Sequence, residues 1–396
     1  MYTTILVRFG ELNTKGKNKK TFIQKLFTNI KRALKNYPTL EYIKAHDRIY
    51  IELNDENYEA VSESLSIVSG IQNFSVAVRV EKNQDAIVNK AFELAQKCSG
   101  KTFKVKVKRA DKNFPVRSDD MVRLIASKIL RESEFKVNVH EPDFYVHADI
   151  RLEGAFVFTD VIPGAGGFPL GVGGKALLLM SGGIDSPVAA HLLMKRGVEV
   201  EAIHFASPPY TSDGAIQKVK DLLHVLTRVQ GKIKLTIIPF TKLQEEIYKN
   251  EDDSYHITIM RRMMYRIAEK VANHDNCLAI ASGESIGQVA SQTLESMATI
   301  NEVVRIPMIR PLAVSDKLDI ISIAKKIGTY EISIRPFIDC CTIFTPKNPS
   351  TKPNNKRAEN LEKEFDYVTL IDECIENREV MWIKENDIPD ELAEFL

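Results

Sequence analysis

From residue 175 onward, short apolar segments alternate with amphipathic ones, and this alternation constrains the fold more than any other feature. It predicts strands at 176–180, 199–205, 233–239, 277–282 and 302–309, and helices at 186–196, 214–230, 255–273 and 315–327. Mostly apolar strands separated by helices form a doubly wound parallel sheet with both faces covered, so we expect an α/β domain. Ligands of such sheets bind beyond the carboxyl ends of the strands, and functional residues are expected there.

The segment Ser181-Gly-Gly-Ile-Asp-Ser186 follows the first strand and precedes the helix that Pro187 opens. Gly182 and Gly183 let successive N–H groups point into one concavity, with a helix N-terminus behind them, which favours a phosphate chain. Asp185 repels phosphate, so its expected role is to hold Mg²⁺ or to fix the loop. The segment resembles the SGGxDS signature of PP-loop enzymes, which split ATP between its α- and β-phosphates; a chance Gly-Gly turn is the alternative.

Three further segments fit a nucleotide site. His204-Phe205 ends the second strand, where an aromatic or backbone edge would meet adenine. Arg261-Arg262 lies on the 255–273 helix and either faces phosphate or belongs to a solvated face. The polar turn from Gly283 to Gln292 follows the fourth strand and suits a close backbone approach to a ligand.

The first half predicts two small α+β units. The first has strands at 2–8, 48–53 and 71–80, with helices at 22–34 and 57–67; the second has helices at 84–98 and 118–132, a strand at 102–108 and a hairpin over 143–162. Residues 1–175 carry 28 Lys+Arg against 21 Asp+Glu, whereas residues 176–396 carry 26 against 32. A basic half joined to an acidic one suggests that the first half contacts a polyanion.

The strand at 102–108 alternates apolar side chains with lysines, which predicts a half-buried strand with an ammonium-lined open face. A guarded edge strand is the alternative, but it does not explain why the cations continue into the next loop. We favour RNA contact over that alternative, through a set of six cations: Lys104, Lys106, Lys108, Arg109, Lys112 and Arg117.

The remaining features concern the domain boundaries, the location of the protein and its cysteines. Residues 164–174 hold six glycines but match neither common phosphate-loop motif, so they predict a flexible connection. We expect domains at 1–72 and 73–165, a linker at 166–175 and a catalytic domain with a C-terminal helical extension at 176–396.

No apolar run approaches the ~18 residues of a membrane span, and no signal peptide is evident, so we expect a cytoplasmic protein. Five cysteines without a CxxC pair predict neither disulfides nor a zinc site.

Three motifs together resemble the tRNA 4-thiouridine synthetase (ThiI) family: SGGIDSPVA at 181–189, GESIGQVASQT at 283–293 and RPLAVSDK at 310–317. The resemblance implies a ferredoxin-like domain, an RNA-binding THUMP domain and a PP-loop domain. It implies a tRNA sulfurtransferase that adenylylates uridine 8 with ATP and then replaces the C4 oxygen by persulfide sulfur. By the same resemblance Asp185 and Lys317 form a catalytic pair, and the contacts to ATP are Leu179, Met180, Ser181, Gly182, Gly183, Asp185, Ser186, His204, Phe205, Arg261, Gly283 and Gln292.

Cys340 matches the family cysteine that turns over with a persulfide on a C-terminal rhodanese domain. Only about forty residues follow the stretch 346–356, and they predict two helices with Trp382 packed between them, whereas a rhodanese domain needs ~100 residues. We therefore expect a separate cysteine desulfurase as sulfur donor. The sequence leaves open the need for Cys340, the role of Cys341 and the thiazole-forming role of the long form in thiamine biosynthesis.

The resemblance also suggests a homodimer with one tRNA-binding half presenting substrate to the partner's catalytic half. Two alternatives are weighed against the thiolation hypothesis: another THUMP or PP-loop enzyme that modifies tRNA, and a non-catalytic tRNA-binding protein with a decayed loop. The intact Ser181, Asp185, Ser186 and Lys317 argue against the second alternative.

Overall fold

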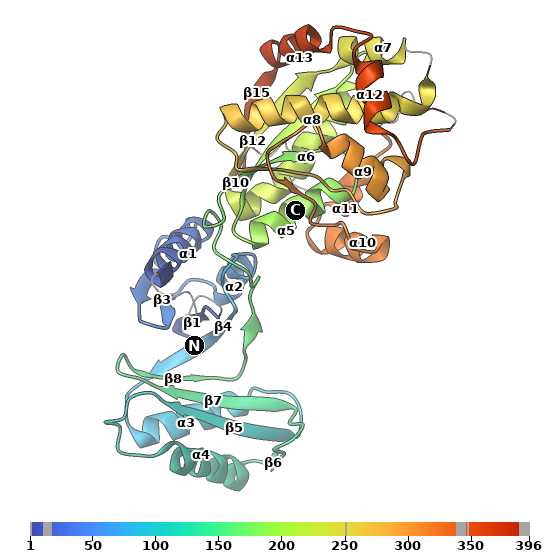
Figure 1. Ribbon diagram of the computed structural model, residues 1–396. Helices are drawn as coiled ribbons and strands as arrows, with labels where there is room; N and C mark the ends of the chain where they lie inside the picture. Colours follow the sequence, from blue (N-terminus) through green and yellow to red (C-terminus); the bar gives the residue numbers. More distant parts are fainter. Residues whose placement is uncertain (1, 11–17, 250–251, 338–345, 347, 388–396) are drawn as a thin grey trace. The chain divides into compact units, whose positions relative to one another are not determined.

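The computed structural model describes residues 2–10, 18–249, 252–337, 346 and 348–387 (Figure 1). The chain divides into two compact units, Met1–Pro169 and Leu170–Leu396, which we call unit 1 and unit 2. The boundary falls inside the glycine-rich segment predicted as a linker. That segment is hydrogen-bonded within both units: Gly70 N–H donates to the Gly166 carbonyl at 2.8 Å, and Gly171 N–H donates to the Gly197 carbonyl at 2.8 Å.

Unit 1 holds a mixed sheet whose described strands follow the order β2-β3-β1-β4-β8-β7-β5-β6, with β9 paired to β4. The strands are β1 (Thr4–Arg8), β2 (Glu41–Lys44), β3 (Arg48–Glu52), β4 (Asn73–Val80), β5 (Thr102–Arg109), β6 (Lys136–Val137), β7 (Phe144–Ile150), β8 (Ala155–Phe158) and β9 (Ile162–Pro163). The helices are α1 (Lys19–Ala33), α2 (Tyr58–Ser66), α3 (Gln84–Ala95) and α4 (Ser118–Glu132). The predicted elements are present, with ends shifted by a few residues.

The long strand β4 joins the two halves of unit 1. Its first residues pair with β1 and its last three pair with β8, so both halves share one strand. Alternation along β1 explains the layers: Ile5 and Val7 face the core under α1 and α2, whereas Leu6 faces a second apolar cluster that contains Tyr50 and Phe156. The Tyr50 and Phe156 rings stack with centroids 5.0 Å apart.

Buried ion pairs reinforce this junction. The guanidinium of Arg48 on β3 donates from Nη1 to Oδ2 of Asp149 on β7 at 2.6 Å, and both side chains are almost fully buried. Arg151 donates from Nε to the other Asp149 oxygen at 3.0 Å and forms a fork with Asp47 at 3.0 and 3.1 Å. Breaking a buried pair leaves an uncompensated charge, so these contacts hold the halves in one arrangement.

Unit 2 holds a sheet whose described strands follow the order β14-β13-β10-β11-β12-β15. The strands are β10 (Lys175–Leu179), β11 (Glu199–Ala206), β12 (Lys232–Pro239), β13 (Ala279–Ala281), β14 (Met308–Ile309) and β15 (Glu379–Lys384). All pairings are parallel except that of β12 with β15, which confirms the predicted α/β fold. No helix in the described part of the chain is long and apolar enough to cross a membrane.

Helices cover both faces of this sheet (Figure 1). The core under one face includes residues of α5 (Asp185–Lys195), α6 (Asp213–Gln230), α10 (Lys317–Lys326) and α11 (Tyr330–Ser333). The other face is covered mainly by α7 (Thr241–Tyr248), α8 (His256–His274), α9 (Leu294–Asn301), α12 (Asn355–Glu362) and α13 (Tyr367–Glu376). Because β10 lies between β11 and β13, the chain reverses its winding direction at β10, and ligands bind at such switch points.

Two local predictions were wrong. The predicted strand at 302–309 is mostly the turn after α9, with only Met308–Ile309 paired as β14. The C-terminal extension is not only helical: after α12 and α13 comes β15, which pairs antiparallel with β12 and leaves Trp382 45% exposed instead of packed. The polar ends of the β15 segment hid its strand character, and the open edge of β12 supplies the hydrogen-bond partners that a strand there needs.

Candidate functional site

The loop after β10 is built by its own hydroxyl groups. Ser186 Oγ donates to the Ser181 carbonyl at 3.0 Å and accepts from Ser181 N–H at 3.1 Å, while Gly183 N–H donates to Ser181 Oγ at 3.3 Å. These contacts close the loop at the point where α5 begins. The loop therefore places the Ser181 and Ser186 hydroxyls beside the N-terminus of α5, and a helix N-terminus is an arrangement that binds phosphate. We call residues 181–186 the phosphate loop.

Gly283, in the turn after β13, braces this loop from the other side. A Cβ atom at Gly283 would lie 2.8 Å from both the Asp185 carbonyl carbon and the Ser186 nitrogen, so only glycine permits this approach. The sequence indicated a close backbone approach at Gly283. The structure shows that its neighbour is the phosphate loop.

Asp185 is held by two side chains, one from the first residue of α10 and one from the turn that follows β13. Lys317 Nζ donates to Asp185 Oδ1 at 2.6 Å, and Gln288 Nε2 donates to Oδ2 at 3.0 Å. The structure thus brings together Asp185 and Lys317, which are 132 positions apart in the sequence. Gln288 was not among the predicted site residues. It lies inside the quoted 283–293 motif, but nothing in its spacing distinguished it from other loop residues.

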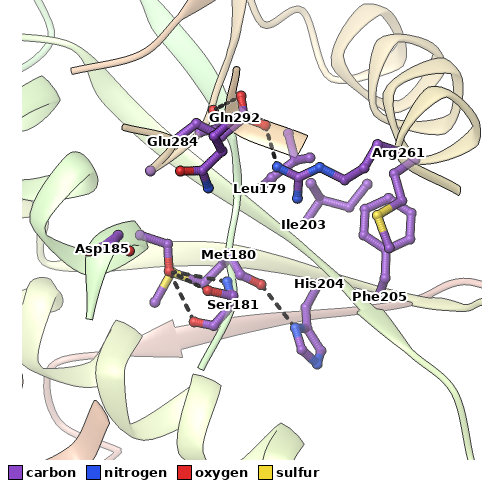
Figure 2. A pocket seen from close by; sticks show the side chains of 14 residues that line it. Leu179, Met180, Ser181, Asp185, Ile203, His204, Phe205, Arg261, Glu284 and Gln292 are labelled. Atoms are coloured by element: carbon purple, nitrogen blue, oxygen red, sulfur yellow. Dashed lines mark hydrogen bonds and ion pairs between the residues drawn. The ribbon is translucent and has the colours of Figure 1, made fainter. Parts of the chain in front are cut away.

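A pocket of about 660 Å³, open to solvent, lies beyond the carboxyl ends of β10 and β11 (Figure 2). Inside it His204 Nδ1 lies 2.9 Å from the Met180 carbonyl oxygen, which fixes the imidazole beside the strand end. The sequence did not predict four of the lining residues: Ile203, Met264, Ser282 and Glu284. The remaining lining residues are all predicted ATP contacts: Leu179, Met180, Ser181, Asp185, Ser186, His204, Phe205, Arg261, Gly283 and Gln292.

The two adjacent arginines of α8 separate. Arg261 lines the pocket and pairs with Glu284. Arg262 points the other way and is buried on Glu362 of α12, to which its Nε donates at 2.7 Å. The interpretation that Arg262 faces phosphate is therefore wrong, because successive residues of a helix point about 100° apart.

Glu284 is the most buried acid of the pocket. Ser282 Oγ, Tyr265 Oη and Arg310 Nε donate to its Oε2 at 2.9, 2.8 and 2.7 Å, and Arg261 donates to Oε1. Burial alone would raise the pKa of this carboxyl, but the two guanidinium groups and the hydrogen bonds lower it to about 2. Burial beside the Glu284 charge also raises the pKa of Tyr265, so the carboxyl is ionised and the phenol is protonated at neutral pH.

The predicted RNA-contacting cations lie on and beside β5. Lys106, Lys108, Lys112 and Arg117 are exposed, and the Lys106 ammonium lies 3.9 Å from the centroid of the Tyr145 ring on β7. Lys104 donates to the Val139 carbonyl at 2.7 Å. Arg109 donates to the Phe114 carbonyl at 2.8 Å, so it holds the following loop.

Cys340 and Cys341 lie outside the described residues. The described cysteines are Cys98, which is half-buried, and Cys277 and Cys374, which are buried. Burial raises the pKa of the Cys277 thiol to about 12 and that of Cys374 to about 11. Neither is a thiolate at neutral pH, and Cys374 packs in the core of unit 2.

A phosphate loop at the switch point of a parallel sheet, with a paired carboxylate and ammonium at its mouth, defines a PP-loop nucleotide-binding protein. A family model described as thiamine biosynthesis protein (ThiI) matches residues 171–367, and models of the ThiI ferredoxin-like domain and of the THUMP domain match 4–75 and 80–160. A crystal structure of a 4-thiouridine synthetase–RNA complex with bound ATP is similar with a TM-score of 0.89 and 39% identity, over 97% of this chain and 100% of that chain.

PH1313 from Pyrococcus horikoshii Ot3 shares the fold, with a TM-score of 0.65 and 22% identity over 82% of this chain and 99% of that one. The chain belongs to the ThiI family, as the three sequence motifs predicted.

Proposed function

We propose that this chain is a tRNA sulfurtransferase that uses ATP to convert uridine 8 of tRNA to 4-thiouridine. The observation that carries the proposal is the ion pair between Asp185 and Lys317 beside the phosphate loop, in a chain 39% identical to a 4-thiouridine synthetase that was crystallised with RNA and ATP. The basic strand of unit 1 supports an RNA substrate.

ATP binds along the pocket, with its phosphates on the loop from Ser181 to Ser186 and its adenine beside Leu179, Met180, His204 and Phe205. The lining of the pocket supports this placement, because it includes residues of the loop at the start of α5 together with apolar and aromatic side chains of β10 and β11. Arg261, Gly283 and Gln292 complete the wall. The pocket therefore has one region for the phosphates of ATP and another for the flat adenine ring.

The reaction proceeds in three displacements. The C4 oxygen of uridine attacks the α-phosphorus, the bond from that phosphorus to the bridging oxygen breaks, and pyrophosphate leaves. The outer sulfur of a persulfide then attacks C4, AMP leaves with the former carbonyl oxygen, and the base is left joined to the donor cysteine by an S–S bond. A thiol finally attacks the donor's sulfur, so that a new disulfide forms, the S–S bond to the base breaks and 4-thiouridine is released. An adenylate leaves far more readily than a bare carbonyl oxygen, which is the purpose of the first step.

Asp185 and Lys317 are the catalytic pair. Charge develops on the oxygens of the α-phosphorus as the uridine oxygen attacks, and an ammonium at the mouth of the phosphate loop stabilises that charge. Lys317 Nζ donates to Asp185 Oδ1 at 2.6 Å and Gln288 donates to Asp185 Oδ2 at 3.0 Å, so both charged groups are held in place. Because the two charges are already positioned before the reaction, they need no reorganisation during it.

Mg²⁺ fits this site as a companion of ATP. No group of three acidic, histidine or cysteine side chains in the described residues forms a metal cage, but Mg²⁺ is commonly held by one or two carboxylates together with substrate phosphates. Asp185 is the carboxylate beside the phosphate loop and would hold the ion. When bound, Mg²⁺ neutralises phosphate charge and so favours the departure of pyrophosphate.

The partners follow from the proposed reaction. We assign tRNA contact to Lys104, Lys106, Lys108, Arg109, Lys112 and Arg117, and sulfur delivery to a separate cysteine desulfurase. Cys340 remains a candidate for sulfur handling. A homodimer would let one subunit present tRNA to the other, and the cytoplasm is where we expect the protein to meet its tRNA.

Mass spectrometry of nucleosides tests the proposal directly. We would incubate unmodified tRNA with the chain, ATP, Mg²⁺ and a persulfide-loaded cysteine desulfurase, and then digest the RNA. We expect 4-thiouridine at position 8, pyrophosphate release that depends on tRNA, and neither product with a tRNA that has cytidine at that position. ATP binding with no 4-thiouridine under these conditions would refute the assignment.

A further inference from the structure

Glu284 gathers donors from three separate segments around the pocket. Arg261 and Tyr265 come from α8, Ser282 directly follows β13, and Arg310 directly follows β14. Only 3% of Glu284 is exposed, although it lies at the wall of an open pocket. Figure 2 shows the Arg261 guanidinium directed toward Glu284, next to Gln292.

We propose that Glu284 is the positioning residue of the nucleotide pocket: it fixes the Arg261 guanidinium at the pocket wall and clamps the turn at Gly283 against the phosphate loop. The inference rests on the proposed binding of ATP in this pocket. It assigns a role to a residue that does not touch the reacting atoms and acts through Arg261 and Gly283.

The first effect is on Arg261. An arginine side chain has many rotamers, and fixing it before ligand binding removes an entropic cost from the binding step. The carboxylate of Glu284 fixes Arg261 by a charge-assisted hydrogen bond. A neutral side chain at Glu284 would leave Arg261 and Arg310 as neighbouring cations that repel each other.

The second effect is on the turn. Gly283 lies between Ser282 and Glu284, and both neighbours belong to this network. Ser282 Oγ donates to Glu284, and Ser282 N–H donates to the Ile309 carbonyl at 3.1 Å. The backbone at Gly283 is therefore held on both sides. Its approach to the Asp185–Ser186 peptide then fixes the start of α5, where the phosphate loop ends.

Glu362 on the opposite side of α8 offers a matched control. It is 2% exposed and accepts hydrogen bonds from two arginines of α8: Arg262 at 2.7 and 3.1 Å and Arg266 at 2.7 and 2.9 Å. Its loss removes a carboxylate from two cations, as the loss of Glu284 does, although Arg262 keeps a longer contact with Glu302 at 3.5 Å. Glu362 does not line the pocket, and this is the difference that the comparison uses.

The test measures the dissociation constant of ATP by titration calorimetry, without tRNA, for the wild-type chain and for Glu284→Gln, Glu362→Gln, Arg261→Met and the double variant Arg261→Met/Glu284→Gln. We expect Glu284→Gln to weaken ATP binding about tenfold, which corresponds to the free energy of one charge-assisted hydrogen bond. The variant should also raise KM for ATP more than it lowers kcat. Glu362→Gln should lower the unfolding temperature but leave ATP binding within about twofold of wild type. In the Arg261→Met background, Glu284→Gln should change the free energy of ATP binding by less than half as much as it does in the wild-type background.

If Glu284→Gln does not fold, Glu284→Gln/Arg310→Met removes one charge of each sign, and we expect it to fold with the same weakened binding. Equal losses of ATP affinity in the Glu284 and Glu362 variants, or full additivity with Arg261→Met, would overturn the inference. Wild-type affinity in Glu284→Gln would do the same while leaving the thiolation assignment intact. ATP binding with the expected pattern but without 4-thiouridine formation would support the inference and refute only the assignment.

Discussion

At the scale of single residues, the pair of Asp185 and Lys317 is the sharpest test of the chemistry. Replacing Lys317 by alanine removes the ammonium 2.6 Å from Asp185, and we expect the rate of tRNA-dependent pyrophosphate release to fall about 10²- to 10³-fold. Asp185→Asn should give a loss of similar size. The tRNA dissociation constant should not change, because the cations of unit 1 are untouched.

Lys326, an exposed lysine in the last turn of the same helix α10, is the control for this pair. Lys326→Ala should keep the wild-type rate. If Lys317→Ala retained full pyrophosphate release, the catalytic role of the pair would have to be abandoned, whatever the binding data showed.

Glu284 makes the stability of unit 2 depend on pH. Its pKa is lowered to about 2 in the folded chain from 4.5, so the carboxylate contributes stability that is complete above about pH 6 and is lost as the pH falls. Between pH 6 and pH 3.5 the wild type should lose about 1.5 kcal/mol of unfolding free energy that Glu284→Gln does not lose. Urea unfolding of both proteins at the two pH values measures this, and parallel losses would contradict the assigned ionisation.

At the scale of elements, strand β5 combines structural and exposed cations. Arg109 holds the loop at Phe114 and Lys104 donates to Val139, whereas Lys106 and Lys108 are exposed on the strand. We expect Lys106→Gln/Lys108→Gln to weaken tRNA binding and to reduce the slope of log affinity against log salt by about two. Arg109→Gln should lower stability as well as tRNA affinity, because Arg109 holds the loop at Phe114 and is also one of the cations assigned to tRNA.

The control for β5 is Lys97, which is 62% exposed beyond α3. Titrations of tRNA at several salt concentrations should give Lys97→Gln the wild-type slope. An unchanged slope for the β5 double variant would remove this strand from the RNA interface and leave its lysines as guards of a sheet edge.

The elements also show what a sequence can predict. Periodicity located α1 and α4, and the alternation of β5 located that strand, because each of them buries one face. The helices α6 and α8 are buried on more than one side and were located by their alternation with apolar strands. The strand β15 was missed because its hydrogen-bond partners lie on β12, about 150 positions earlier, and no local pattern encodes a distant partner. The role of Glu362 was missed for the same reason, since its arginines lie about 100 positions away.

At the scale of the whole molecule, the phosphate loop and the order of strands and helices were predictable because their signals are contiguous. The networks around Glu284 and around Asp149 were not, since each assembles charges from segments far apart in the chain. The sequence predicted two small α+β units that follow one another along the chain. It did not reveal that they share β4 and bury ion pairs between them, so that they form one compact unit.

This organisation predicts how the chain unfolds. Unit 2 has its own apolar clusters, and the halves of unit 1 are joined by β4 and by the Arg48–Asp149 pair, so we expect two calorimetric transitions and not three. ATP binds only the folded pocket of unit 2 and should raise the midpoint of one transition alone. Asp149→Asn leaves Arg48 and Arg151 without their shared carboxylate and should lower the midpoint of the other transition. A third transition, or a shift of both midpoints with ATP, would mean that the cooperative units are not those that the shared strand and the buried charges define.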